Sequence, residues 1–209
     1  LARCGVGFIR LADQDRVDWT NLARQSLYDS ADAAAGRLKA QAAAAAVARI
    51  DPNVTVDARI LRVDSGNLPQ LASDVDLLLD GTDDVPTRYL INDFAVAARK
   101  PWVYAGVVAA EGMVMPVLPR RSACLRCLFE DPPATWLRAA QVGVLGPAVT
   151  VVAALAAMEA IKLLSGHPEN ASPCLLRLDM WGKVVQRLDA SRPRPDCPAC
   201  GASARPAAS

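Results

Sequence analysis

Two Cys-x-x-Cys pairs constrain the fold of this chain most tightly: Cys124 with Cys127, and Cys197 with Cys200. A gap of two residues lets both sulfurs of a pair reach one ion, and two such pairs complete a tetrahedral Cys₄ zinc site. The second pair reads DCPACG, in which proline and glycine shape the turn. Because residues 128–196 separate the pairs, a shared Zn²⁺ would tie the C-terminal tail to the body of the fold.

Two alternatives to zinc stay open at this point, namely paired disulfides in a secreted protein and a redox-active dithiol. The only histidine, His167, lies in a polar loop, SGHPEN, and is a poor ligand candidate. We expect structural zinc. A site closed by four thiolates has no open position for catalysis, so the chemistry must lie elsewhere.

The composition is that of a soluble globular protein with one large core: 209 residues, 52% hydrophobic and 22% charged. A formal net charge of +1 gives no reason to expect nucleic acid or an anionic membrane as a partner. The long uncharged run after residue 138 is interrupted by glycine and proline, so we expect a buried helix at 148–164 rather than a membrane span. Zinc-type cysteines without a secretion signal predict a cytoplasmic location.

The hydrophobic pattern divides the chain into two halves. Strands alternate with helices in the first half, which is typical of a parallel sheet. The expected strands there are 7–13, 54–61, 75–80 and 101–107, with 75–80 buried on both faces, and the expected helices are 36–50 and 85–100. In the second half, 112–118 and 174–189 predict antiparallel strands, with a turn at Gly182 and a proline- and arginine-rich loop at 131–138. The predicted class is α/β: a Rossmann-like, largely parallel sheet with helices on both faces, an antiparallel C-terminal extension and a Cys₄ zinc site.

Several polar residues follow the predicted strands. Asp13 ends the first strand, where an acid in a dinucleotide-type fold accepts hydrogen bonds from a ribose. Asn21 and Arg24 are three residues apart, so that a helical turn can present both to phosphate oxygens. Lys39 begins the alanine-rich helix and can add a positive charge. Each residue also has an ordinary reading as a solvated surface group.

Acidic residues follow the strand at 75–80 in the segment LDGTDD, residues 79–84. Ligands of open α/β sheets bind at the carboxyl ends of strands, where carboxylates can hold Mg²⁺ between protein and phosphate. Acids in such positions also commonly cap helices. Cys4 and Cys174 have apolar neighbours in the sequence, and we expect buried structural thiols there.

Taken together, these segments resemble the ThiF/MoeB/HesA enzymes, bacterial relatives of the ubiquitin-activating enzymes, over essentially the whole chain. The matching segments are DQDRVDWTNLARQ, GRLK, DGTDD followed by TRYLIND, PWVYAGV, EGMVMPVLP, CLRCLFEDPP, GVLGP, AAMEAIKLLSG and CPAC. The resemblance implies ATP- and Mg²⁺-dependent adenylation of the C-terminal glycine of a ubiquitin-like sulfur carrier that ends in Gly-Gly. It also implies a homodimer and a persulfide-carrying sulfurtransferase as a partner.

Carried over by position, the resemblance assigns Asp13 to the ATP ribose and Asp83 to Mg²⁺. Asn21, Arg24 and Lys39 are assigned to the phosphates, with Arg24 and Asp83 acting in catalysis. The four paired cysteines are assigned to zinc. The implied domain is a single nucleotide-binding unit over 1–209, with 111–209 as its antiparallel, zinc-bearing half.

The sequence departs from the family pattern at several points. The strand and glycine-rich turn expected before Leu1, and an N-terminal arm, are missing, so we expect a fragment. Leu38 replaces a usual proline, and Asp84 replaces a usual asparagine. No cysteine lies between Cys127 and Cys174, which predicts that sulfur comes from another protein's persulfide.

Three other classes remain as alternatives. An NAD-dependent oxidoreductase explains the strand–helix alternation and Asp13, but not the remaining motifs. A non-catalytic subunit that dimerises with an active relative would keep the fold and the zinc. A zinc-stabilised docking module is the third class.

Overall fold

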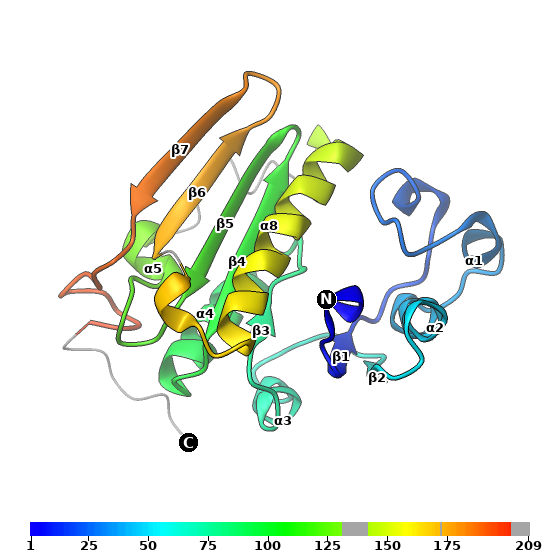
Figure 1. Cartoon of the computed structure of the whole chain (residues 1–209), viewed down its shortest axis with the longest axis horizontal. Coiled ribbons are helices and arrows are strands. Elements are labelled where there is room, and N and C mark those ends of the chain that lie inside the picture. The colour runs from blue at the N-terminus through cyan, green and yellow to red at the C-terminus, as the bar shows by residue number, and fades with distance from the viewer. Residues whose placement is uncertain (131–141, 172, 202–209) are drawn as a thin grey trace. The chain divides into compact units, whose positions relative to one another are not determined.

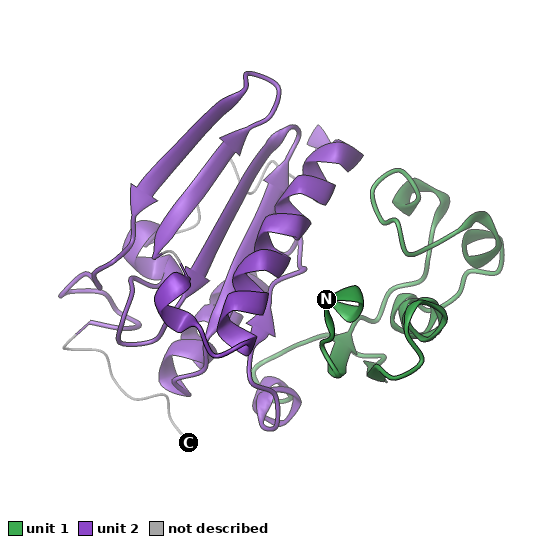
Figure 2. Cartoon of the chain, in the orientation of Figure 1, with its two compact units in different colours: residues 1–67 green, residues 68–209 purple. Residues whose placement is uncertain are grey.

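The computed structural model describes residues 1–130, 142–171 and 173–201. The chain forms two compact units, Leu1–Asn67 and Leu68–Ser209 (Figure 2). The predicted loop at 131–138 lies outside the described residues. Each unit has its own sheet, and the two sheets are described separately below.

The first unit is built on two parallel strands, β1 (Phe8–Ala12) and β2 (Thr55–Arg59). Its main helix, α2 (Lys39–Ile50), connects them and packs Val47 against Val54 and the strand residues beside it. Alanines dominate the buried face of α2, and their small side chains let backbone segments pack closely. The short elements are η1 (Ala2–Cys4), η2 (Trp19–Asn21) and α1 (Ser30–Ala34).

The second unit contains a five-stranded sheet in the order β3-β4-β5-β6-β7 (Figure 1). The strands are β3 (Leu78–Leu79), β4 (Trp102–Val108), β5 (Glu111–Val117), β6 (Cys174–Asp179) and β7 (Val184–Asp189). The β3–β4 pair is parallel and the other three pairs are antiparallel. The mixed α/β class is therefore confirmed, with parallel pairing in the N-terminal half and antiparallel pairing in the C-terminal half.

Helices cover both faces of this sheet at β4. The helices of the unit are α3 (Leu68–Ala72), α4 (Val85–Ala97), α5 (Leu125–Leu128), α8 (Gly146–Leu164) and η3 (Pro168–Asn170). Successive side chains of a strand point to opposite faces. Val103 packs against α8, whereas the ring of its neighbour Tyr104 lies under the Arg88 guanidinium of α4. Trp102, Val103 and Tyr104 are consequently all buried.

Helix α8 lies across β4 and β5, and a glycine allows its close approach (Figure 1). A Cβ atom at Gly112 of β5 would lie 2.2 Å from Cγ2 of Val152, too close for any larger residue. The prediction of a buried helix here was wrong in one respect. Only one face is buried, formed by Ala148, Val152, Ala156 and Ala160 at intervals of four residues, while Met158 is 54% exposed.

Two further expectations can be compared with the structure. Among the described helices, α8 alone is long and apolar enough to span a membrane by length and composition. The strand predicted at 75–80 is reduced to β3, and it is not buried on both faces, because Leu79 is 42% exposed. In the described chain β3 pairs with β4 only.

Candidate functional site

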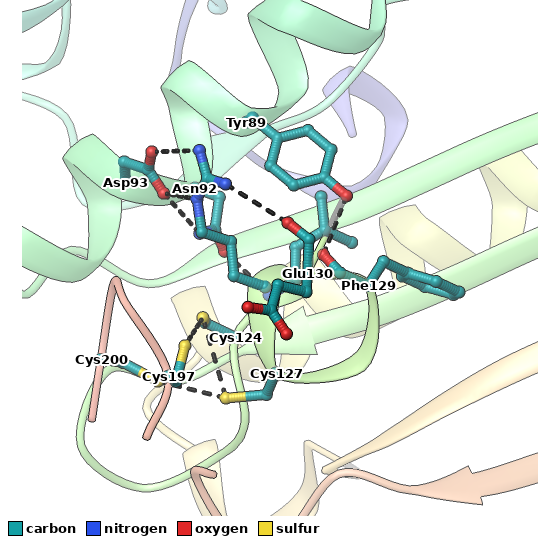
Figure 3. Close-up of polar contacts among 11 residues, drawn as sticks. Tyr89, Asn92, Asp93, Cys124, Cys127, Phe129, Glu130, Cys197 and Cys200 are labelled. Carbon is teal, nitrogen blue, oxygen red and sulfur yellow. Dashed lines mark hydrogen bonds and ion pairs between the residues drawn. The ribbon is translucent and has the colours of Figure 1, made fainter. Parts of the chain in front are cut away.

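The sulfur atoms of Cys124, Cys127, Cys197 and Cys200 gather at one place in the second unit (Figure 3). The Sγ–Sγ distances are 3.9 Å for Cys124–Cys127, 3.6 Å for Cys124–Cys197 and 3.3 Å for Cys127–Cys200. Zn–S bonds of about 2.3 Å in a tetrahedron place sulfurs about 3.8 Å apart, so the four thiols fit Zn²⁺. Disulfide sulfurs lie about 2.05 Å apart, and none of the six cysteines forms such a bond.

Each Cys-x-x-Cys turn is called a knuckle below: the first is Cys124–Cys127 and the second is Cys197–Cys200. The turn of the second knuckle depends on the glycine that follows it. A Cβ atom at Gly201 would lie 2.5 Å from the Pro195 carbonyl oxygen and 2.6 Å from that of Cys197. The Gly201 N–H donates a 2.9 Å hydrogen bond to the same Cys197 carbonyl. The glycine of the DCPACG sequence is therefore required by the backbone geometry of this turn.

The pKa values of Cys124, Cys197 and Cys200 are shifted in different directions. A hydrogen bond from Cys200 lowers the pKa of Cys124 to about 5, although burial opposes the change. The same interaction raises the pKa of Cys200, and burial raises that of Cys197. The cluster thus favours a thiolate at Cys124, the protonation state in which sulfur binds a metal ion.

Helix α4 holds the first knuckle in place (Figure 3). The fully buried Asn92 accepts a 2.8 Å hydrogen bond through Oδ1 from the Leu125 N–H, and its side chain also hydrogen-bonds Cys124. The Tyr89 hydroxyl donates to the Phe129 carbonyl oxygen at 2.9 Å. Both ends of the knuckle are therefore fixed by one rigid helix.

An ion pair adds to this attachment. Arg126 donates from Nε and Nη2 to the two carboxylate oxygens of Asp93, at 2.8 Å each, and its guanidinium lies 4.7 Å from the centre of the Tyr89 ring. These hydrogen bonds raise the pKa of Arg126. The tail is anchored as well, because the Arg194 N–H donates to Sγ of Cys127 at 3.3 Å.

Sequence reasoning missed the roles of Tyr89, Asn92 and Asp93, which lie in the segment TRYLIND. Residues three and four apart share a helix face, so their spacing on α4 was a signal available in the sequence. The sequence did not show which residues they would contact, because those partners lie more than 30 residues away.

In the first unit, two of the predicted nucleotide residues, Asp13 and Lys39, are linked through Asp15. Nζ of Lys39 donates to Oδ2 of Asp15 at 3.0 Å, and its backbone N–H donates to the Asp15 carbonyl oxygen. Asp13, directly after β1, accepts a 2.8 Å hydrogen bond from the Asp15 N–H. Lys39 is 8% exposed, so it is not the solvated surface lysine of the ordinary reading.

Asn21 and Arg24 lie on one turn, as their spacing predicts. Asn21 is buried, and its Oδ1 accepts from the Asp18 N–H in a capping box of η2. Nη1 of Arg24 donates to the Thr20 carbonyl oxygen at 2.8 Å. In the described chain the rest of this guanidinium has no protein partner.

Tyr28 lies against the same cluster and was not predicted. Its hydroxyl donates to the Lys39 carbonyl oxygen at 3.2 Å. Burial, assisted by the negative charges of Asp13 and Asp32, raises the pKa of Tyr28 to about 12. The hydroxyl therefore stays protonated to a higher pH than that of an ordinary tyrosine, and its hydrogen bond supports the start of α2.

The predicted Mg²⁺ ligand lies in the second unit, in the loop after β3. Asp83 is exposed and has no hydrogen-bond or ion-pair partner among the residues that the structure describes. Asp84 instead caps α4, because its Oδ2 accepts from the Thr87 N–H at 3.0 Å. This capping role is one that asparagine also performs, so the departure at Asp84 preserves the helix start.

The two cysteines outside the metal cluster differ from the expectation of buried thiols. Cys4 is exposed, in η1. Cys174, the first residue of β6, is half-buried. The prediction was wrong for Cys4 because apolar neighbours in sequence do not cover a side chain in a short 3₁₀ turn.

This chain resembles known proteins over almost its whole length. The model of the ThiF family matches residues 1–199. The chain is 34% identical to a "Sulfur carrier protein ThiS adenylyltransferase" of Bacillus subtilis, covering 96% of this chain and 60% of the relative. It is 36% identical to a "Sulfur carrier protein adenylyltransferase" of Thermus thermophilus, covering 96% of this chain and 76% of the relative.

A solved structure supports the fold. The Escherichia coli protein MccB, in a structure determined with ATP, superposes with a TM-score of 0.82 at 22% identity, over 96% of this chain and 61% of that one. The chain thus spans about three fifths of the length of the Bacillus relative and of this structure.

Proposed function

Because this chain belongs to the ThiF family, we propose that it takes part in ATP-dependent adenylation of the C-terminal carboxylate of a ubiquitin-like sulfur carrier. The observation that carries the proposal is similarity over 96% of the chain to relatives that are named adenylyltransferases. Those names favour adenylation over the alternative of an NAD-dependent oxidoreductase. The pathway, thiamine or molybdopterin, is left open in the proposal.

We assign each predicted residue a part in that reaction. Asp13 accepts hydrogen bonds from the ribose of ATP, while Asn21, Arg24 and Lys39 bind its phosphates. Two anions must meet when the carrier carboxylate attacks the α-phosphorus and pyrophosphate leaves. Positive side chains that neutralise the developing charge therefore lower the barrier.

The proposed metal residue is Asp83. Its carboxylate is exposed and unpartnered among the described residues, as a ligand for Mg²⁺ should be. Mg²⁺, when bound, would supply charge neutralisation at the phosphates. Zn²⁺ is assigned to the four cysteines as a structural ion, since their thiolates would leave no open coordination position.

The proposal is tested by carrier-dependent ATP–pyrophosphate exchange in the full-length protein. Asp83→Ala should abolish exchange. Arg24→Ala should reduce it severely, because no other kind of side chain reproduces the hydrogen bonds of a planar guanidinium. Asp76→Ala, which removes another exposed carboxylate of the same unit, is the control and should retain exchange. Exchange by Asp83→Ala within about tenfold of wild type would rule out the metal role.

The partners follow from the same proposal. We propose a carrier that ends in Gly-Gly, a homodimeric cytoplasmic enzyme, and delivery of sulfur by another protein's persulfide that attacks the acyl-adenylate. The stretch from Leu128 to Pro173 contains no cysteine to form a covalent bond with the carrier. Mass spectrometry without reductant should find no carrier adduct, and an adduct on Cys4 or Cys174 would contradict this route.

A further inference from the structure

A buried ion pair lies directly beneath the loop that carries Asp83. Nε of Arg88, on the first turns of α4, donates to Oδ2 of Asp80 at 3.1 Å. The Asp80 side chain is 0% exposed and that of Arg88 is 10% exposed. The Arg88 guanidinium also stacks over the Tyr104 ring, 5.5 Å from its centre.

The pair is joined to the loop backbone through Thr82. Oδ1 of Asp80 accepts from the Thr82 N–H at 2.8 Å and from its hydroxyl at 2.7 Å. Nη2 of Arg88 donates to the Thr82 carbonyl oxygen. The backbone N–H and carbonyl oxygen of Thr82 are thus both hydrogen-bonded to this buried pair.

Asp83 is therefore flanked on both sides by fixed residues. Before it lies Thr82, held by Asp80 and Arg88, and after it lies Asp84, which caps α4. Asp83 itself makes no side-chain contact of this kind within the described chain. An exposed carboxylate on a backbone fixed at both neighbours is preorganised for a ligand that the protein does not itself supply.

Stability alone is a poor explanation for such a pair. The free-energy cost of removing two charges from water is often larger than the gain from their attraction. Apolar residues of similar size often stabilise a core equally well. Burial does raise the pKa of Asp80, against the opposing effect of the Arg88 guanidinium. The pair spans the sequence from the end of β3 to α4, and what it orders is the loop between them.

We infer that Asp80 and Arg88 are positioning residues that hold the 80–84 loop so that Asp83 is preorganised to bind the divalent cation of a metal–nucleotide substrate. This inference rests on the proposed function. Neither residue is assigned contact with substrate, so both act through the loop backbone.

The test is Mn²⁺ binding to the full-length protein in the presence of a non-hydrolysable ATP analogue, followed by electron paramagnetic resonance. Arg88→Lys keeps the charge but replaces the planar fork that reaches Asp80 through Nε and Thr82 through Nη2 with a single ammonium group, and it should weaken Mn²⁺ binding about tenfold or more, as loss of outer-shell partners does. The half-maximal Mg²⁺ concentration for exchange should rise by a similar factor, while the rate at saturating Mg²⁺ largely recovers. Thr82→Val, which removes only the hydroxyl hydrogen bond, gives a milder variant that avoids unfolding.

The control is Lys162→Met, which breaks the Lys162–Glu159 pair on α8 and should lower stability without changing Mn²⁺ binding. If Asp83→Ala loses Mn²⁺ while Arg88→Lys and Thr82→Val bind it within about twofold of wild type, the inference is overturned and the proposed function stands. If Asp83→Ala itself retains Mn²⁺ binding, the metal role of the loop fails and the inference with it. Weaker Mn²⁺ binding by Arg88→Lys but not by Lys162→Met supports the inference.

Discussion

Asn92, buried in the middle of α4, accepts a hydrogen bond from the backbone N–H of Leu125, the residue that follows the first zinc-ligand candidate. This contact joins a helix to a cysteine knuckle 33 residues later in the chain. Because the Leu125 N–H is buried, it has no access to water as a substitute acceptor. The knuckle is therefore positioned by the helix as well as by any metal ion.

Removing the Asn92 side chain should loosen the knuckle. Asn92→Ala leaves the Leu125 N–H unsatisfied, at a cost of about 1–3 kcal/mol in the free energy of unfolding. Zinc affinity should fall about tenfold or more, measured by competition with a chelator. Asp93→Ala breaks the partly exposed pair with Arg126 and the hydrogen bond from Nδ2 of Asn92, but it leaves the Leu125 N–H satisfied, so its cost should be smaller than that of Asn92→Ala. Equal effects of the two substitutions would contradict the role of Asn92.

The four clustered thiols should hold one Zn²⁺ per chain. Metal analysis of protein purified without chelator should give a stoichiometry near one, and Cys197→Ser combined with Cys200→Ser should lose the ion, since a tetrahedral site cannot persist with two ligands gone. Cys4→Ser combined with Cys174→Ser is the matched control and should keep it. Full zinc retention in the first double variant, or no zinc in the wild type, would refute the site.

Tyr28 should make stability fall at high pH. Its folded pKa of about 12 lies above the ordinary value of 10.0, so the folded state favours the protonated phenol. The resulting contribution is fully present below pH 10 and is lost as the pH rises through the folded pKa. Between about pH 9 and about pH 11.5, the urea midpoint should fall less in Tyr28→Phe than in wild type. Equal decreases would show that Tyr28 titrates normally.

The edges of the parallel strand pairs should promote self-association of residues 1–209. In the described chain β1 pairs only with β2, and β3 only with β4. Phe8 and Leu79 on these strands are 41% and 42% exposed, and apolar strand edges associate. Light scattering checks this expectation, and a monodisperse monomer would disprove it.

The sequence by itself determined the features that depend on short spacing. The Cys-x-x-Cys pairs, the turn at Gly201 and the strand–helix alternation were all readable, because each is set by residues that are close along the chain. The antiparallel hairpin of β6 and β7 was predicted for the same reason.

Tertiary structure alone decided which of several similar residues does what. Asp83 and Asp84 are adjacent acids, and packing makes Asp84 a helix cap while Asp83 has no side-chain partner among the described residues. The apolar composition of α8 predicted a buried helix, but only one face of the helix is buried. Asn92 meets Leu125, and Arg88 meets Asp80, because the elements that carry them pack together. Such pairings depend on the three-dimensional arrangement of whole elements, which the spacing of residues along the chain does not specify.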